Sequence, residues 1–225
     1  MKNKPSSTSV TPRSTRTAPS DSVIKRLPRY FRYLRILMRN NVTRISSGEL
    51  SVMMNVTASQ IRQDLNCFGG FGQQGYGYNV EYLYAKICDL LGVGAGLCSV
   101  IIGAGNLGRA IVRSNMFEKR GVEIIGTFDV DLSIVGSKIE HVGVYHLDSL
   151  EEFCKNNKVD FAVLTLPKEN AQEVASRLVE LGVKGFWNFT GQELELPEDT
   201  VVENVHLGDS LMTLCYRITA EDGEK

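Results

Sequence analysis

The sequence predicts an α/β protein in two parts, a basic helical part followed by a part built on a mostly parallel sheet. Apolar side chains at helical spacing and helix-capping patterns recur between Pro28 and Leu65. From Leu97 onward, strand and helix patterns alternate, as in sheets with crossover helices. Charge differs between the parts: residues 23–65 hold eight basic and two acidic residues, a net +6, whereas the whole chain carries −1.

Composition narrows the class of protein. A chain of 225 residues with 43% hydrophobic and 23% charged residues is typical of a globular protein of one large or two modest domains. No apolar run approaches the roughly 20 residues that span a membrane, and the N-terminus lacks the apolar segment of a secretory signal. The five cysteines are scattered and never form a CxxC pair. We therefore expect a cytoplasmic protein with reduced thiols, no membrane contact and no metal site.

Residues 1–22 are rich in Ser, Thr, Pro and charge, and they predict a disordered tail. A helix is expected from Pro28, because Phe31, Leu34, Leu37 and Met38 form one stripe with the arginines mostly off it. A basic segment of this kind favours contact with a polyanion such as DNA, although the arginines could equally form a solvated helix face.

Two further helices follow closely. Ser46 and Glu49 have the spacing of a capping box, which predicts a helix through Met54. Thr57 and Gln60 have the same spacing, and Val56 and Ile61 are placed for a hydrophobic staple. The sequence thus predicts a helix-turn-helix whose last helix faces inward through Ile61 and Leu65.

The outer side of that last helix carries Ser59, Arg62, Gln63 and Asn66, which can reach phosphates or base edges. The glycine-rich run 68–78 predicts a β-hairpin, which would form a wing. Residues 23–91, closed by a linking helix over 82–91, are therefore predicted to be a winged-helix DNA-binding domain, with a helical oligomerisation module as the alternative. The expected DNA contacts are Arg29, Arg32, Arg44, Ser46, Ser47, Thr57, Ser59, Gln60, Arg62, Gln63, Gln73, Gln74 and Tyr76.

A glycine motif marks the second part. Gly103-Ala104-Gly105-Asn106-Leu107-Gly108 follows the apolar strand 97–102 directly and opens a helix expected over 107–117. The next strand, 122–128, ends at Asp129, twenty-one residues after Gly108. This order is typical of a Rossmann dinucleotide-binding unit.

Each residue of the motif has a physical reason. Gly103 permits the tight turn, Gly105 lets backbone N–H groups approach a pyrophosphate, and Gly108 lets the helix lie close to the strand. The helix N-terminus favours phosphate, while the Asp129 carboxylate can bind ribose hydroxyls and repel a 2′-phosphate. The cofactor is therefore predicted to be NAD(H), with Asp131 as the reserve carboxylate. A glycine loop that binds nothing is the alternative.

The remaining elements complete a domain over residues 92–206. A helix capped by 148–151, a strand over 159–166, a helix over 169–181 and strands over 184–189 and 201–205 are expected. Catalysis is not expected, because no acid–base group is placed beside a nicotinamide. The Tyr82…Lys86 pair has dehydrogenase spacing but precedes the glycine turn, and the histidines at 141 and 146 fit a sheet edge.

Over residues 24–218 the chain resembles the Rex family of bacterial redox-sensing repressors. The resemblance is carried by residues 27–34, 46–50, 61–65, 75–78, 103–108, 128–131, 164–167, 185–189 and 209–214. It implies a homodimer on an AT-rich palindromic operator that represses fermentative and anaerobic respiratory genes until NADH rises. It also implies that the C-terminal helix, about 207–218 within residues 207–225, is exchanged between the subunits.

The same resemblance implies that Thr165, Leu166 and Pro167 line the nicotinamide end of the site, with Asn188 and Phe189 nearby. The chain departs from the family where basic residues are usual, with Gln63 in the last helix and Gln73 and Gln74 in the wing. We therefore expect weaker, less salt-sensitive DNA binding or a shifted operator, and a divergent paralogue with weakened DNA binding stays open. A small NAD-dependent oxidoreductase is the alternative from the enzyme class.

Two other departures concern the C-terminal part. Residues 190–193 replace a loop that often contains an Ala/Thr-Pro pair, and His206 stands where the family usually has an aspartate of an interdomain network. His206 could couple pH to the switch by protonation near neutral pH, or simply substitute as a neutral hydrogen-bonding group.

Overall fold

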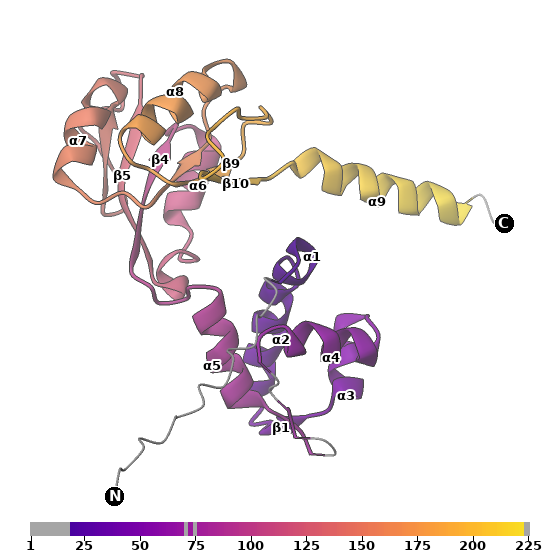
Figure 1. Ribbon diagram of the computed structural model, residues 1–225. Helices are drawn as coiled ribbons and strands as arrows, with labels where there is room; N and C mark the ends of the chain where they lie inside the picture. Colours follow the sequence, from indigo (N-terminus) through magenta and orange to yellow (C-terminus); the bar gives the residue numbers. More distant parts are fainter. Residues whose placement is uncertain (1–18, 70–71, 74–75, 223–225) are drawn as a thin grey trace, which may run out of the picture. The chain divides into compact units, whose positions relative to one another are not determined.

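The computed structural model describes residues 19–69, 72–73 and 76–222. Contacts within the chain divide it into two compact units, Met1–Gly92 and Val93–Lys225. Figure 1 shows the first unit in indigo to magenta and the second in magenta to yellow.

The first unit is a helical bundle with a small sheet. Its helices are α1 (Asp21–Ile24), α2 (Leu27–Arg39), α3 (Ser47–Met54), α4 (Ala58–Asn66) and α5 (Val80–Leu90). Strands β1 (Arg44–Ile45), β2 (Gly72–Gln73) and β3 (Gly77–Asn79) form an antiparallel sheet in the order β1-β3-β2. The predicted winged helix-turn-helix is therefore confirmed. Helical structure begins earlier than expected, with α1 at Asp21 and α2 one residue before Pro28.

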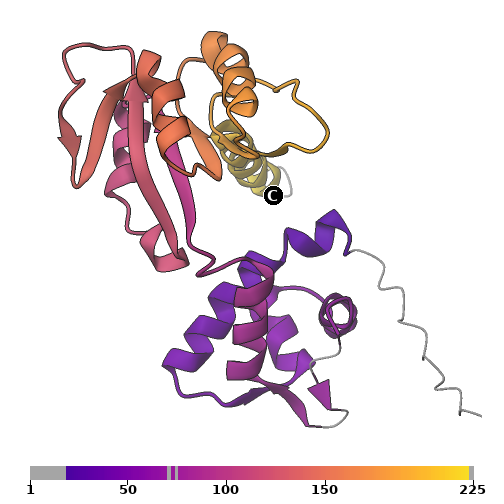
Figure 2. The same ribbon diagram turned by 60° about the vertical axis from the view of Figure 1, so that its left-hand side comes forward.

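The core of this unit lies between α2 and α5, which run side by side in Figure 2. Leu34 of α2 and Leu83 and Ile87 of α5 are fully buried, and Phe31 stacks on Tyr84 with ring centroids 5.3 Å apart. Ile61 and Leu65 of α4 are also fully buried, as the sequence pattern predicts. The opposite side of α4 is therefore left to solvent.

The two predicted capping boxes differ in outcome. At α3 the box is confirmed: the Glu49 amide donates to Ser46 Oγ at 3.1 Å, and the Ser46 amide donates to Glu49 Oε2 at 2.8 Å. At α4 only half of it forms, since the Gln60 amide donates to Thr57 Oγ1 while the Gln60 side chain donates to Asp64 instead. A buried carboxylate accepts a stronger hydrogen bond than the capping pattern offers.

The hairpin is also confirmed. Gly72 pairs with Tyr78 and Gln73 with Gly77. Gly77 has a φ of +68°, and a Cβ there would lie 2.7 Å from the carbonyl oxygen of Ile45. Glycine is therefore required where the wing crosses β1. Gln74, one of the predicted DNA contacts, lies outside the described residues.

The second unit is a seven-stranded sheet in the order β10-β9-β8-β4-β5-β7-β6. The strands are β4 (Leu97–Ile102), β5 (Val122–Asp129), β6 (Lys138–Ile139), β7 (Val142–His146), β8 (Phe161–Leu164), β9 (Gly185–Asn188) and β10 (Val201–Asn204). Every pairing is parallel except that of β6 with β7. The predicted Rossmann-type architecture is therefore confirmed.

Helices cover both faces of this sheet. Ile102 and Leu164 point to the face covered by α7 (Leu150–Asn156) and α8 (Lys168–Glu180). Ile101 and Val163, their neighbours in sequence, point to the face covered by α6 (Asn106–Arg113). The central strands are thus buried on both sides, which is why they appear in the sequence as continuous apolar runs.

Two local expectations are wrong. Helix α6 ends at Arg113 instead of continuing to 117, and Ser114 is extended. The chain then turns so that Phe117 is buried against Trp187, their ring centroids 5.9 Å apart, before the 3-10 helix η1 (Glu118–Arg120). The predicted cap at 148–151 is instead a second 3-10 helix, η2 (Leu147–Ser149), capped by the His146 side chain.

The last helix, α9 (Leu207–Asp222), has its side chains exposed from 207 to 220. Leu207, Leu211, Leu214 and Ile218 recur at helical spacing and are all more than half exposed. An apolar stripe of this length is typical of a surface that another chain covers. In the part of the chain that the structure describes, no helix combines the length and the apolar character needed to cross a membrane.

Candidate functional site

The glycine turn has the close approaches that its motif predicts. Gly103 has a φ of +102°, and a Cβ on it would lie 2.8 Å from the backbone of Thr165. A Cβ on Gly108 would lie 2.0 Å from the carbonyl oxygen of Gly103. A Cβ on Gly105 would meet nothing within 4 Å. Two glycines are therefore required by the turn itself, while the third leaves an open surface over the turn.

Hydrogen bonds fix this turn from both sides. The Ala104 amide donates to Asp129 Oδ2 at 2.6 Å, and the Thr165 hydroxyl donates to the Gly103 carbonyl oxygen at 2.8 Å. Arg109 Nε donates to the Ala104 carbonyl oxygen at 2.8 Å. The turn therefore keeps its shape through contacts with the ends of β5 and β8 and with α6.

The start of α6 is suited to an anion. Gly105 is the N-cap of this helix, so the amides of residues 105–108 have no preceding helical carbonyl to bond. These amides and the helix dipole give partial positive charge at the open side of the turn. The geometry fits a pyrophosphate group at Gly105.

Asp129 ends β5 directly beside that turn. Besides the Ala104 amide, its carboxylate accepts the Asp131 amide at 3.0 Å through Oδ1. Each carboxylate oxygen keeps a further lone pair for a hydroxyl donor. The reserve candidate, Asp131, is exposed, and hydrogen bonds from Ser133 hold the pKa of its carboxyl below the ordinary value. Asp129 is therefore the better placed of the two for a ribose.

A cavity of about 590 Å³ opens at the carboxyl ends of β4, β5 and β8. The strand order reverses at β4, and ligands of open α/β sheets bind at such a point. Six of the predicted residues line the cavity: Gly103, Gly105, Asp129, Thr165, Leu166 and Pro167. Val130, Leu147, Asn170 and Glu173 also line it and were not predicted. Asn170 and Glu173 lie one turn apart on α8, a spacing that the predicted helix already contained.

Ala104, Asn106, Leu107 and Gly108 belong to the turn but do not line this cavity, and neither do Asn188 and Phe189. Asn188 is buried; its amide nitrogen donates to the Gln192 carbonyl oxygen and to Asn204, and its amide oxygen accepts from Thr190. Phe189 packs edge-on against Trp187. These two residues shape the loop after β9 in this structure.

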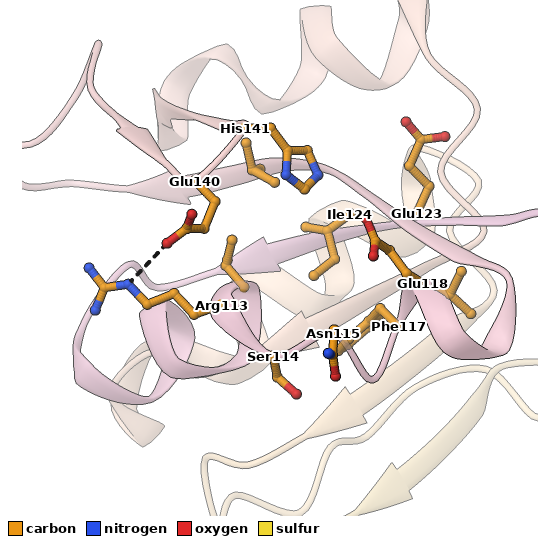
Figure 3. Close-up of a pocket in the computed structure, with 12 residues that line it drawn as sticks. Arg113, Ser114, Asn115, Phe117, Glu118, Glu123, Ile124, Glu140 and His141 are labelled. Carbon is orange, nitrogen blue, oxygen red and sulfur yellow. Dashed lines mark ion pairs between the residues drawn. The ribbon is translucent and has the colours of Figure 1, made fainter.

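A second cavity, of about 440 Å³, lies at the other end of β5 and is shown in Figure 3. Its apolar wall includes Phe117 and Ile124, and its rim carries His141, Glu118 and an Arg113–Glu140 pair with N···O 3.8 Å apart. Of the described residues that line it, none belongs to a glycine turn or to the first turn of an α-helix. The first cavity is therefore the better candidate for the predicted dinucleotide site.

The outer face of α4 is the centre of the candidate nucleic-acid surface. Ser59, Arg62, Gln63 and Asn66 are exposed there. Arg62 Nη1 donates to Ser47 Oγ at 3.1 Å, which joins α4 to the start of α3. Thr57 and Ser46, the N-caps of these two helices, are exposed as well.

The base of the wing adds a second group. Arg44 Nη1 donates to the Tyr76 carbonyl oxygen at 3.2 Å, and both side chains are exposed. Gln73 lies in β2, paired with Gly77. Arg32 is exposed on α2, with its guanidinium carbon 5.7 Å from the ring centroid of Tyr33.

Two predicted DNA contacts are engaged inside the unit. The Arg29 guanidinium donates through Nη2 to the Met54 carbonyl oxygen at the end of α3. The Gln60 amide nitrogen donates to Asp64 Oδ1 at 2.8 Å. Their nearest partners are therefore protein groups, which the residue types alone did not indicate.

His206 lies in the segment between β10 and α9. Its Nε2 is 3.7 Å from Glu193 Oε1, and Glu193 is mostly exposed. The contact joins two of the positions at which the sequence departs from the family pattern. A role for His206 in pH response stays a hypothesis.

Each of the two units contains a stretch that matches a known protein family. Residues 20–66 match the family model described as a putative DNA-binding protein N-terminus, and residues 99–191 match the model of the CoA binding domain. Relatives named redox-sensing transcriptional repressor Rex come from a Thermoanaerobacter species, at 53% identity over 93% of each chain, and from Clostridium perfringens, at 51% identity over 90% of this chain and 96% of the relative.

Solved structures agree over the same length. RSP in complex with β-NAD⁺ and operator DNA matches with a TM-score of 0.87 and 53% identity, over 92% of this chain and 95% of that one. RSP in complex with β-NADH matches with a TM-score of 0.85 and 50% identity, over 92% and 97% of the two chains. A further RSP structure is described as that of a Rex-family repressor.

Proposed function

The chain belongs to the Rex family of redox-sensing transcriptional repressors, and from that premise we propose that it binds operator DNA as a homodimer and releases it when NADH rises. The observation that carries this proposal is the presence in one chain of a glycine turn with Asp129 behind it and a winged helix with exposed polar and basic side chains on α4. The described residues that line the first cavity assemble no acid–base pair, which suits a sensor, and we propose no turnover. Its place of action would be the cytoplasm.

NAD(H) would be held at the first cavity by named groups. The turn Gly103–Gly108 and the start of α6 would bind the pyrophosphate, and Asp129 would accept hydrogen bonds from the adenine ribose. Thr165, Leu166 and Pro167 would lie at the nicotinamide end. The bound dinucleotide would act as a signal through its redox state.

The response to NADH must come from differential affinity. A ligand bound equally well by the DNA-competent and DNA-incompetent dimers shifts nothing, however tight its binding. We infer that the DNA-incompetent dimer binds NADH more tightly, and that NAD⁺ binding permits or favours the DNA-bound state. A shift from 99% bound to 99% released requires a roughly 10⁴-fold difference in affinity.

The direct test is fluorescence anisotropy of an AT-rich palindromic duplex mixed with the full chain. We expect binding at low salt, loss of binding on titration with NADH, and much less effect of NAD⁺ at equal concentration. The absence of binding at low salt would refute the repressor function. Binding that is indifferent to NADH would refute the sensor function and favour a paralogue that has lost the switch.

Gln63 offers a test of how the chain holds DNA. We expect Gln63→Lys to make log K fall more steeply with log salt, by about 0.9 per added phosphate contact and about 1.8 for the two subunits. Its exposed place on α4 next to Arg62 supports a phosphate contact. Salt titrations of operator binding would measure the slope.

Asp199→Asn is the matched control for that variant. Asp199 is exposed in the turn before β10, so this change also adds one unit of positive charge but in the other unit of the chain. If both variants change the slope equally, the effect is one of net charge, and the proposed role of position 63 is wrong. A steeper slope in Gln63→Lys alone would support the proposal that this chain has lost a phosphate contact at position 63.

A further inference from the structure

Asp64 is a buried carboxylate on the inner face of α4. It is fully buried beside Ile61 and Leu65, where an unpaired charge would be strongly destabilising. Four donors surround it: Arg26 Nε and Tyr30 Oη at 2.7 and 3.0 Å from Oδ2, and Arg26 Nη2 and Gln60 Nε2 at 2.7 and 2.8 Å from Oδ1. Every hydrogen-bonding direction of the carboxylate is thus used.

These donors come from two places in the chain. Arg26 is the N-cap of α2 and Tyr30 lies in its first turns, whereas Gln60 lies one turn before Asp64 on α4. The bidentate contact of Arg26 fixes both the distance and the plane of the carboxylate. Asp64 therefore ties α4 to the beginning of α2, across 38 residues of sequence.

Burial would raise the pKa of Asp64, but the hydrogen bonds of Arg26, Gln60 and Tyr30 outweigh it and hold the pKa below the ordinary value. The carboxylate is therefore ionised near neutral pH. Buried ion pairs of this kind contribute little to stability relative to apolar residues of the same shape, and their attested benefit is a unique geometry. What Asp64 and its donors fix is the position of α4 relative to the start of α2.

The apolar contacts of Ile61 and Leu65 do not fix that position alone, because hydrophobic contact has no direction. A roll of α4 would move Arg62 and Gln63 together with Asp64, since successive residues are about 100° apart around one helix. Discrimination between bases needs hydrogen-bond geometry, so it would depend on where α4 places its exposed side chains, Arg62 among them.

Resting on the proposed repressor function, we propose that Asp64 is a positioning residue for DNA recognition, which acts through Arg26, Tyr30 and Gln60 to set the roll of α4 in the operator. It touches no DNA itself. Its loss should therefore reduce the preference for operator over unrelated DNA more than it reduces non-specific binding.

The test is the ratio of affinities for operator and for a scrambled duplex, measured by anisotropy at a temperature where each variant is fully folded. We expect Asp64→Asn to lower this ratio about tenfold, the loss that a displaced base contact brings. The exposed pair Lys86–Asp89, at 3.4 Å on α5, supplies the control: Asp89→Asn makes the same chemical change in the same unit and should keep the ratio.

A variant with Arg26→Met, Tyr30→Phe and Asp64→Leu together separates positioning from stability. Apolar replacement of these three residues, with Gln60 kept, should keep or raise the thermal midpoint, and we still expect a lowered ratio. Tyr30→Phe alone keeps the ion pair and should lower the ratio by less than Asp64→Asn. Operator preference within threefold of the unmodified chain in both Asp64→Asn and the triple variant would overturn the proposal. Absence of operator binding by the unmodified chain would instead refute the repressor function itself.

Discussion

Gly105→Ala is expected to weaken NADH binding at least tenfold while leaving the structure of the free protein intact. A Cβ at this position meets nothing within 4 Å, and its φ of −70° suits alanine, so the fold has no reason to change. The added methyl group would stand where the pyrophosphate must approach the first amides of α6. A tenfold loss corresponds to about 1.4 kcal/mol of binding free energy.

The measurements are NADH affinity by fluorescence titration and the thermal midpoint of the free protein. Gly48→Ala is the matched control, because its Cβ would make only an ordinary contact, 3.7 Å from Ser46 Oγ, far from the glycine turn in sequence. The NADH concentration that half-releases operator should rise by the same factor as the dissociation constant. Unchanged NADH affinity in Gly105→Ala would show that the phosphates do not bind over this turn.

Gly108→Ala, in the same motif, is expected to disturb the fold of the free protein, unlike Gly105→Ala. Its Cβ would lie 2.0 Å from the Gly103 carbonyl oxygen, which no side-chain adjustment can relieve. Both glycines belong to the same sequence motif, yet Gly108 is required by the fold and Gly105 by the proposed ligand. Only the structure separates these two requirements.

The features that the sequence predicted correctly depend on residues that are close together in the chain. The capping box at Ser46, the turn at 103–108 and the delivery of Asp129 depend on residues a few positions apart or on one strand–helix–strand unit. The alternation of buried runs and amphipathic helices was sufficient to predict the order of elements and the parallel sheet. These signals are repeated along the chain, so an error in the predicted bounds of one element does not change the predicted fold.

What the sequence did not predict depends on distant partners. Gln60 has capping-box spacing, but its side chain donates to the buried carboxylate of Asp64, which also pairs with Arg26 from far away in the chain. Asn188 has a residue type suited to a ligand, but Thr190, Gln192 and Asn204 use its side chain. Arg29 is basic, but its nearest acceptor is the end of α3. Polar residues have many possible partners, and only tertiary structure decides among them.

Leu211→Glu with Leu214→Glu in α9 is expected to produce monomers and to abolish tight operator binding. Both side chains are more than half exposed in the single chain, within the stripe that also contains Leu207 and Ile218. Full burial of an exposed leucine contributes about 1.5–3 kcal/mol, and these two side chains are 60% and 54% exposed, so the four copies in a dimer contribute on the order of 5 kcal/mol. Four buried carboxylates in their place would oppose association further.

The consequence for DNA follows from symmetry. In the proposed dimer, two copies of α4 would bind a palindromic operator, one on each half-site, and the second contact would be favoured by the high effective concentration that the dimer provides. A monomer keeps the base contacts of one half-site and loses this advantage, so operator affinity should fall by two orders of magnitude or more. Light scattering measures the oligomeric state and anisotropy the affinity. Ala220→Glu adds a charge on the side of α9 away from the stripe and should remain dimeric. A double variant that stays dimeric would show that α9 is covered by something other than a second copy of the chain.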